Sequence, residues 1–283
     1  MEVLVTGALG QLGHEIRRLS RNKDFSFTFT DINDLDITSK SGMDLYFQNK
    51  KVDAVINCAA YTAVDRAQEE SLLARRVNSD SCSYLSDLSR KYGFGIIHIS
   101  TDFVFSGKKN TPYRENDRTA PLSVYGITKL EGEKHIISKA RSYIIIRTSW
   151  LYSSFGNNFV KTIIKSAGKK MELKVISDEI GTPTYAGDLA SAIFSILPRF
   201  SSGTRQIYHY TNEGTVSWYD FAMSVCELLG IKTPVIPVSS AEYASPAKRP
   251  HYSVLSKEKI KKDFKLTIPY WRESLKTCLE LIK

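Results

Sequence analysis

Short apolar runs separated by helix-periodic stretches dominate the first half of the chain. Runs of consecutive apolar residues are typical of strands buried in a parallel sheet, whereas apolar residues every three or four positions indicate helices. Five strands are predicted in this way, at residues 2–6, 25–30, 52–60, 95–105 and 143–150. Because helix-like stretches separate them, the pattern predicts an α/β fold with a doubly wound parallel sheet of the Rossmann type and right-handed crossovers.

Beyond about residue 150 the elements become shorter and less regular. The strands and helices predicted in this half lie at residues 173–176, 188–197, 208–210, 217–229 and 271–281. In the first half, one long helix is expected over residues 69–91, with Asn78 inside it. The contrast predicts a larger domain, residues 1–150, and a smaller lobe, residues 151–283, that interleaves with late elements of the sheet.

Composition is ordinary for a globular protein. Hydrophobic residues make up 42% and charged residues 24% of the 283 residues. No apolar run approaches the roughly 18 residues of a membrane span, and the N-terminus lacks the basic segment of a secretory signal. We therefore expect a cytoplasmic protein with no membrane partner. The cysteines, Cys58, Cys82, Cys226 and Cys278, show no metal-ligand spacing, so free thiols are expected.

The net charge of +9 comes largely from short basic pairs such as Lys108–Lys109 and Lys169–Lys170. Such pairs are typical of solvated surfaces, so no nucleic-acid partner is predicted. The same charge suits an anionic small substrate, such as a nucleotide or a phosphate ester.

A glycine-rich turn follows the first predicted strand. Gly7, Gly10 and Gly13 have the spacing G-x-x-G-x-x-G, and a helical pattern starts beside them. A strand, a glycine turn and a helix form the context in which such spacing indicates dinucleotide binding. Gly7 permits a tight turn, Gly10 lets a pyrophosphate approach the backbone, and Gly13 lets the helix pack near the strand. The amides at the helix start are expected to face the phosphates.

An acidic residue, Asp31, ends the second predicted strand about 20 positions after the glycines. A carboxylate there binds the hydroxyls of the adenosine ribose and repels a 2′-phosphate, which favours NADH, and no arginine follows to receive that phosphate. Asp34 and Asp36 leave open which carboxylate binds the ribose. Asp36 and Ile37 begin a segment that is expected to contact the adenine or to cap a helix.

The third predicted strand ends in small residues, which let a cofactor lie against the backbone. Ala60, Tyr61 and Thr62 are expected to pass along that cofactor. Tyr61 has an alternative interpretation as a surface aromatic residue.

Hydroxyl and acidic residues end the fourth predicted strand, where active sites of open α/β sheets lie. Thr101 is placed to donate a hydrogen bond to a substrate carbonyl, with Asp102 beside it, and His98 is expected to be a packed strand residue.

Tyr125 and Lys129 lie at i and i+4 of a predicted helix, on one face. A nearby ammonium favours the phenolate and lowers the pKa of tyrosine, so the pair is a candidate proton donor and acceptor.

Motifs spread over the whole chain resemble those of the extended short-chain dehydrogenase/reductases, and within them the dTDP-4-dehydrorhamnose reductase family. The motifs lie at residues 7–13, 57–65, 100–105, 125–129, 147–152 and 246–250. The resemblance implies NADH- or NADPH-dependent reduction of the C4 ketone of dTDP-4-dehydro-L-rhamnose, a nucleotide sugar. This is the last step of dTDP-L-rhamnose synthesis for cell-surface polysaccharide.

The resemblance also implies roles for single residues. Tyr125 matches the general acid, Lys129 its partner and ribose binder, and Thr101 the third catalytic residue. The remaining matches are with cofactor-binding residues (Gly10, Gln11, Leu12, Asp31, Ala60, Tyr61, Thr62) and substrate-binding residues (Asp102, Trp150, Asn157, Asn158, Arg249). Leu12 and Tyr61 stand where the family commonly has other residues.

Some members of the family are described as homodimers with Mg²⁺ between subunits, and a homodimer stays open here. Glu15 fits such a ligand, but no full set of acidic partners accompanies it, so no metal site is predicted. Two alternatives to a reductase remain: a nucleotide-sugar epimerase or dehydratase on the same scaffold, and a non-catalytic regulatory subunit. The intact Thr101, Tyr125 and Lys129 favour an enzyme.

Overall fold

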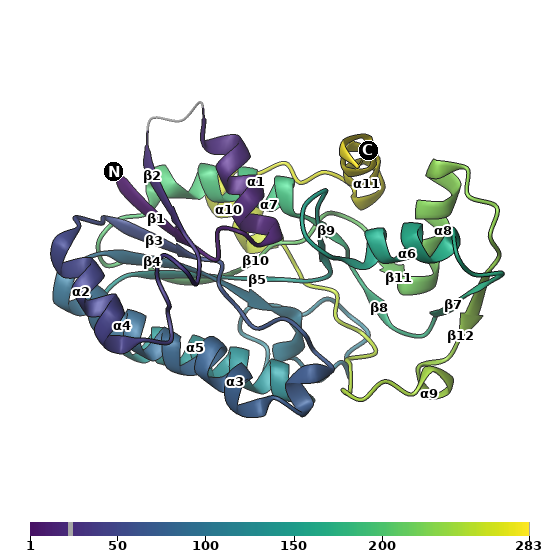
Figure 1. Ribbon diagram of the computed structural model, residues 1–283, viewed down its shortest axis with the longest axis horizontal. Coiled ribbons are helices and arrows are strands. Elements are labelled where there is room, and N and C mark those ends of the chain that lie inside the picture. Colours follow the sequence, from purple (N-terminus) through teal and green to yellow (C-terminus); the bar gives the residue numbers. More distant parts are fainter. Residues whose placement is uncertain (22–24, 283) are drawn as a thin grey trace.

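Six parallel strands form the central sheet of the computed structural model, which describes residues 1–21 and 25–282 (Figure 1). They are β1 (Glu2–Thr6), β2 (Ser26–Thr30), β3 (Ala54–Asn57), β4 (Gly95–Thr101), β5 (Tyr143–Thr148) and β10 (Arg205–His209). Their order is β10-β5-β4-β3-β1-β2, and every pair is parallel. The predicted doubly wound sheet is confirmed. Because β2 and β3 flank β1 on opposite sides, the strand order reverses there, and ligands bind at such a switch point.

Alternate side chains of the strands build a separate core on each face of the sheet. Val3, Val5 and Ile97 face helices α1 (Gln11–Ser20) and α7 (Ala186–Ile196). Leu4, Val55 and Ile96 belong to the opposite core. The helices on that face are α2 (Lys40–Asn49), α4 (Ser81–Tyr92) and α5 (Val124–Lys139) (Figure 1). Two buried faces explain why these strands are apolar at consecutive positions.

The predicted strands run past their observed ends, because the chain leaves the sheet early at its carboxyl edge. The third strand ends at Asn57, the fourth at Thr101 and the fifth at Thr148. Thr101 then caps the short 3-10 helix η3 (Asp102–Val104) by accepting from the Phe103 amide. The residues beyond these ends are the ones that line the site described below.

The long helix predicted over residues 69–91 is interrupted by a π-helical segment. Its parts are α3 (Ser71–Arg75), the π segment η2 (Arg76–Asp80) and α4, and the short helix η1 (Arg66–Gln68) precedes them. Asn78 lies in the π segment, accepts from the Tyr61 amide and donates to the Tyr61 carbonyl and the Thr128 hydroxyl. The segment thus ties the loop after β3 to the helix that carries Tyr125 and Lys129. Such bulges are frequent at functional sites.

A second, smaller region packs beside the carboxyl ends of the sheet (Figure 1). It contains the strand pairs β6 (Leu151–Tyr152) with β9 (Thr184–Tyr185), β7 (Leu173–Ile176) with β12 (Val235–Val238), and β8 (Ile180–Gly181) with β11 (Val216–Ser217). Its helices are α6 (Phe159–Ala167), α8 (Trp218–Leu229), α9 (Ser240–Tyr243) and α11 (Trp271–Leu281), around a core that includes Tyr152, Phe221 and Leu275.

Three elements of the second half, β10, α7 and α10 (Glu258–Phe264), return to the layers of the central sheet, and the short helix η4 (Leu197–Arg199) follows α7. The helix predicted over residues 271–281 is confirmed as α11. The division at residue 150 stays a prediction. In the described part of the chain, no helix combines the length and apolar character needed to cross a bilayer.

Candidate active site

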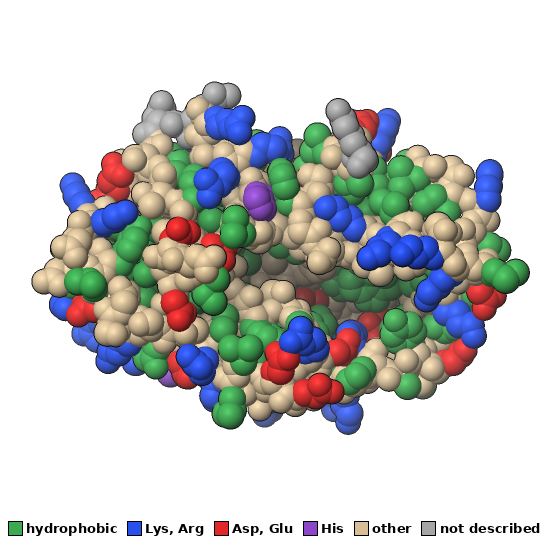
Figure 2. All heavy atoms as spheres, viewed as in Figure 1, with side chains coloured by type: hydrophobic (Ala, Val, Ile, Leu, Met, Phe, Trp, Pro, Cys, Tyr) green, Lys and Arg blue, Asp and Glu red, His purple; other side chains and the backbone are tan. Residues whose placement is uncertain are grey.

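A cleft of about 560 Å³ opens at the carboxyl ends of the strands, beside the second region. Figure 2 shows the face of the molecule hollowed between the two regions. The predicted site residues that line the cleft are Gly7, Gly10, Gln11, Leu12, Gly13, Ala60, Thr62, Thr101, Asp102, Tyr125, Lys129, Trp150, Asn157, Asn158 and Arg249. Residues far apart in the sequence therefore meet here, as the parallel sheet requires.

The glycine turn has the geometry of a phosphate-binding loop. Gly7 has a φ of +65°, and a Cβ there would lie 2.6 Å from the Ala59 nitrogen. A Cβ on Gly13 would lie 2.5 Å from the Gly7 carbonyl oxygen. No side chain caps the start of α1, so its first amides are free to bind an anion. This cradle fits the pyrophosphate of a dinucleotide.

Asp31 braces this loop. Its Oδ2 accepts from the Leu9 amide at 2.8 Å and its Oδ1 from the Ile32 amide at 2.9 Å. Asp31 thus stands next to the glycine turn at the end of β2, where the sequence predicts the adenosine ribose, although it does not line the main cleft.

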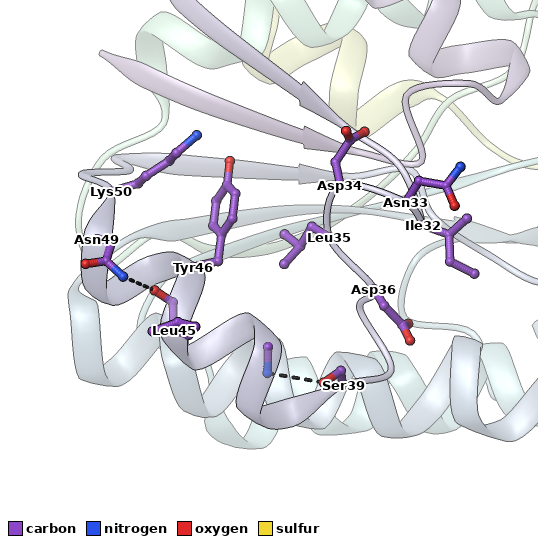
Figure 3. A pocket seen from close by; sticks show the side chains of 11 residues that line it. Ile32, Asn33, Asp34, Leu35, Asp36, Ser39, Leu45, Tyr46, Asn49 and Lys50 are labelled. Atoms are coloured by element: carbon purple, nitrogen blue, oxygen red, sulfur yellow. Dashed lines mark hydrogen bonds between the residues drawn. The ribbon is translucent and has the colours of Figure 1, made fainter.

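Three other predicted cofactor residues also lie outside the lining of the main cleft. Asp36 lines a separate hollow of about 450 Å³ beside α2 (Figure 3) and accepts from the Thr38 amide and hydroxyl. Ile37 packs against the core under α2 and α4. The Tyr61 phenol donates to Glu70 and its backbone amide to Asn78.

Thr101, Asp102 and Tyr125 form a cluster at the base of the cleft, in which Thr101 and Asp102 are buried and Tyr125 is partly exposed. The Thr101 hydroxyl donates to Asp102 Oδ1 at 3.1 Å, and a hydrogen bond joins Thr101 to Tyr125. Burial raises the pKa of Tyr125 to about 12; the bond with Thr101 lowers it and the Asp102 charge raises it. Burial raises the pKa of Asp102 to about 7. Tyr125 therefore holds its proton at neutral pH and can act as an acid.

The sequence predicts that Lys129 lowers the pKa of Tyr125, and in this structure that pKa is raised instead. Lys129 does lie one turn from Tyr125 on α5, but its Nζ donates to the Ile99 carbonyl at 2.6 Å and lies 3.4 Å from His98 Nε2. The ammonium is thus held against β4, and the burial of the phenol outweighs any lowering of its pKa. Burial also lowers the pKa of Lys129 itself.

Tryptophans form the wall of the cleft on the side of the second region. Trp150, with a φ of +48°, stacks on Trp218 with ring centroids 3.5 Å apart and planes 9° apart. A Cβ on Gly181 would lie 2.6 Å from the Trp150 ring, so the ring lies between Trp218 and a backbone. Sequence reasoning missed Trp218; its position directly after the helix cap Ser217 carries no sign of a binding role.

The predicted substrate-binding residues of the second region differ in their placement. Asn157 lines the cleft, whereas Asn158 also caps α6 and donates to Gln11 Oε1 at 2.9 Å, which links the two regions. Arg249 donates to Asp65 at 2.7 Å and lines both the main cleft and an adjoining hollow of about 300 Å³.

Glu15, the acidic residue that the resemblance offers as a metal ligand, lies inside the protein in this structure. Its side chain is fully buried and accepts from Arg18 Nε and from the Ser153 hydroxyl. The carboxylate is thus used for hydrogen bonds within the protein. Among the described residues, no group of three or more His, Cys, Asp or Glu side chains has the spacing to hold a metal ion.

Comparison with known proteins identifies the family. The model of the family described as RmlD substrate binding domain matches residues 1–283. The chain belongs to this family. A dTDP-4-dehydrorhamnose reductase from Aggregatibacter actinomycetemcomitans is 38% identical over 284 residues, covering 97% of both chains.

Solved structures of RmlD-family proteins have the same fold throughout. A dTDP-4-dehydrorhamnose reductase from Clostridium acetobutylicum is 41% identical with a TM-score of 0.95, and the match covers 100% of this chain and 99% of the other. A dTDP-4-dehydrorhamnose reductase from Bacillus anthracis, in complex with NADP, is 35% identical with a TM-score of 0.94, covering 99% and 98% of the two chains. The fold predicted from the motifs is thus confirmed over its full length.

Proposed function

We propose that this RmlD-family protein reduces the C4 ketone of dTDP-4-dehydro-L-rhamnose to the alcohol of dTDP-L-rhamnose, with NADPH or NADH as coenzyme. The observation that carries the proposal is the Tyr125 acid, hydrogen-bonded to Thr101, in the cleft that the glycine turn opens into. The relatives of this chain that carry the reductase name support the same reaction.

The residues present fit a nicotinamide dinucleotide. Gly7, Gly10 and the first amides of α1 would hold the pyrophosphate, Asp31 the adenosine ribose, and Lys129 the nicotinamide ribose. When bound, the coenzyme supplies the hydride that reduces the ketone.

The chain itself supplies the proton and the orientation. Tyr125 gives its phenolic proton to the oxygen that was the ketone. A proton transfer of this kind contributes about 10²–10⁴-fold to the rate. Thr101 orients the phenol through their hydrogen bond, and its own hydroxyl is turned toward Asp102 in this state. The buried Lys129 ammonium, one turn from Tyr125 on α5, favours the phenolate that is left behind.

The tryptophan wall and Arg249 would hold the nucleotide sugar. Trp150 offers an apolar face to the deoxysugar, and Arg249, at the opening of the adjoining hollow, offers a cation to the diphosphate. A larger domain at residues 1–150, a smaller lobe at 151–283, a homodimer and a cytoplasmic location remain predictions that accompany this proposal.

The test is coenzyme oxidation by the purified chain with enzymatically prepared dTDP-4-dehydro-L-rhamnose, followed by the ultraviolet absorbance of NADPH. We expect stoichiometric, substrate-dependent oxidation and dTDP-L-rhamnose as product. Tyr125→Phe should lower kcat by about 10²–10⁴-fold, with coenzyme affinity retained. A folded protein that binds NADPH and leaves it unoxidised, or a Tyr125→Phe variant with full turnover, would contradict the proposal.

A further inference from the structure

A row of buried polar side chains crosses three neighbouring strands behind the site. Thr6 of β1, Asn57 of β3 and His98 of β4 are partners in register, on the face of the sheet covered by α4 and α5 (Figure 1). All three are at most 2% exposed. The positions that precede them on that face, Leu4, Val55 and Ile96, are apolar, so the row lies where the apolar layer changes to polar side chains near the carboxyl ends of the strands.

Hydrogen bonds join the row into a chain that ends on Lys129. The Thr6 hydroxyl lies 2.8 Å from Asn57 Oδ1, and Asn57 Nδ2 lies 3.1 Å from His98 Nδ1. On the other side of the ring, His98 Nε2 lies 3.4 Å from Lys129 Nζ. The mechanism proposed above uses Lys129 but none of the residues behind it.

Around a neutral His98 ring, the protons of these hydrogen bonds can be arranged in only two consistent ways. If Asn57 Nδ2 donates to His98 Nδ1, the ring carries its proton on Nε2, where it faces Lys129; an ammonium cannot accept it. If the Asn57 amide is turned over, Nδ1–H donates to the amide oxygen and Nε2 is free to accept from the ammonium. The oxygen and nitrogen of an amide occupy nearly the same space, so both arrangements fit the same side-chain positions.

We propose that His98 is a positioning residue of the reductase: its Nε2 accepts from the Lys129 ammonium, and its Nδ1–H donates to the Asn57 amide oxygen in the tautomer that this requires. The inference rests on the proposed function for its kinetic consequences, but the tautomer is a property of the protein alone. Burial and the Lys129 charge lower the pKa of His98 well below its usual value, which keeps the ring neutral and able to accept.

Besides His98, few groups lie close enough to interact with the charge of the Lys129 ammonium. Those that face it are Cys82 from α4, Glu133 from α5 and Cys58 after β3. Burial holds the pKa of Cys82 at about 11 and that of Cys58 at about 12, so both thiols are neutral at pH 7. Glu133 is engaged by Arg147 and the Ser100 hydroxyl. His98 and the Ile99 carbonyl are therefore the acceptors nearest the ammonium.

The direct test is nitrogen NMR of the full chain labelled with ¹⁵N-histidine. The five histidines give five sets of ring signals, and His98→Gln identifies the set of His98. We expect a proton on Nδ1 and an unprotonated Nε2 at neutral pH. A ring protonated on Nε2, or on both nitrogens, would overturn the proposal whatever the activity of the chain.

The kinetic test compares His98→Leu, which lacks an acceptor, with His98→Gln, which keeps one. We expect His98→Leu to lower kcat by about tenfold or more, since displacing a catalytic group by about 1 Å costs up to about a hundredfold. Without the acceptor Lys129 loses its proton more easily, so the alkaline limb of kcat should move about one pH unit lower. His98→Gln should keep most of the parental kcat and most of the parental pH dependence. The KM for the nucleotide sugar should stay unchanged.

The matched control is His209→Gln, which removes another buried imidazole of the sheet that lies away from Lys129. It should leave kcat and the alkaline limb as in the parent chain. A folded His98→Leu variant with parental kcat and pH profile would overturn the proposal; if that variant fails to fold, His98→Gln and the NMR result decide. An inactive parent chain would speak against the proposed function instead.

Discussion

The two walls of the cleft differ in the chemistry of their side chains. The wall on the sheet side is polar: Thr101 is hydrogen-bonded to Asp102 and to Tyr125, and the buried pair of Arg147 and Glu133 lies on the neighbouring elements β5 and α5. The wall on the side of the second region is aromatic, with Trp150 stacked on Trp218. Under the proposed function, the chemistry would depend on groups held by hydrogen bonds and charges, whereas the substrate would meet a surface held by packing. Substitutions on the two sides should separate accordingly into effects on kcat and stability and effects on KM.

The buried ion pair under the polar wall should show the largest effect on stability. Arg147 donates to both oxygens of Glu133 at 2.9 and 2.7 Å, and the two side chains are 4% and 0% exposed. Removing one partner of a buried pair leaves an uncompensated charge, so Arg147→Met should destabilise the protein by about 3–5 kcal/mol. Urea denaturation measures this change.

Its control is the double variant Arg147→Met with Glu133→Leu, in which neither charge remains. Replacing both partners of a buried pair with apolar residues is often neutral. We expect the double variant to recover most of the lost stability. Equal destabilisation of the single and double variants would show that packing, and not charge, holds this part of the wall together.

Asp102, in the polar wall, makes the free energy of unfolding of the protein depend on pH. Its pKa is raised to about 7 by burial, so the folded protein favours the protonated form. This stabilisation is fully present below the usual pKa of an aspartate and is lost as the pH rises through about 7. Asp102→Asn should thus gain stability over the parent chain between pH 4 and pH 8, by up to about 4 kcal/mol at about 1.36 kcal/mol per pKa unit. Denaturation of both proteins across this range measures it; a constant difference would contradict the raised pKa.

The sequence predicted the polar wall better than the aromatic one. Thr101, Tyr125 and Lys129 belong to motifs at the ends of strands and the start of a helix, and the topology of a parallel sheet brings such positions together. Trp218 escaped prediction because it reaches Trp150 only through the packing of the second region, over many residues of intervening chain. The direction of the Lys129 ammonium could not be predicted from the sequence either, since it depends on contacts with His98 and Ile99 of β4.

The aromatic wall should govern substrate affinity. Trp218→Leu removes the ring against which Trp150 stacks, while both lie at the wall of the cleft. Aromatic pairs contribute about 0.5–1.5 kcal/mol beyond their burial, so the KM for the nucleotide sugar should rise by up to roughly tenfold with kcat changed much less. Steady-state kinetics measure both constants. Trp218→Phe, which keeps a ring for stacking, is the matched control and should retain more of the affinity; a loss confined to kcat would assign Trp218 to the chemistry instead.

The smallest expected effect concerns the choice of coenzyme at the far end of the polar wall. Asp31 stands beside the glycine turn with both oxygens bound to backbone amides, of Leu9 and Ile32. Its charge would repel the 2′-phosphate of NADPH, and two unit charges about 4 Å apart in water repel by about 1 kcal/mol. Asp31→Asn should therefore raise the ratio of kcat/KM for NADPH to that for NADH by about fivefold. Asp36→Asn is the matched control, because Asp36 lies outside the main cleft with Thr38 as its partner (Figure 3). If Asp36→Asn shifts the ratio and Asp31→Asn does not, the ribose lies farther along the loop than the sequence predicts.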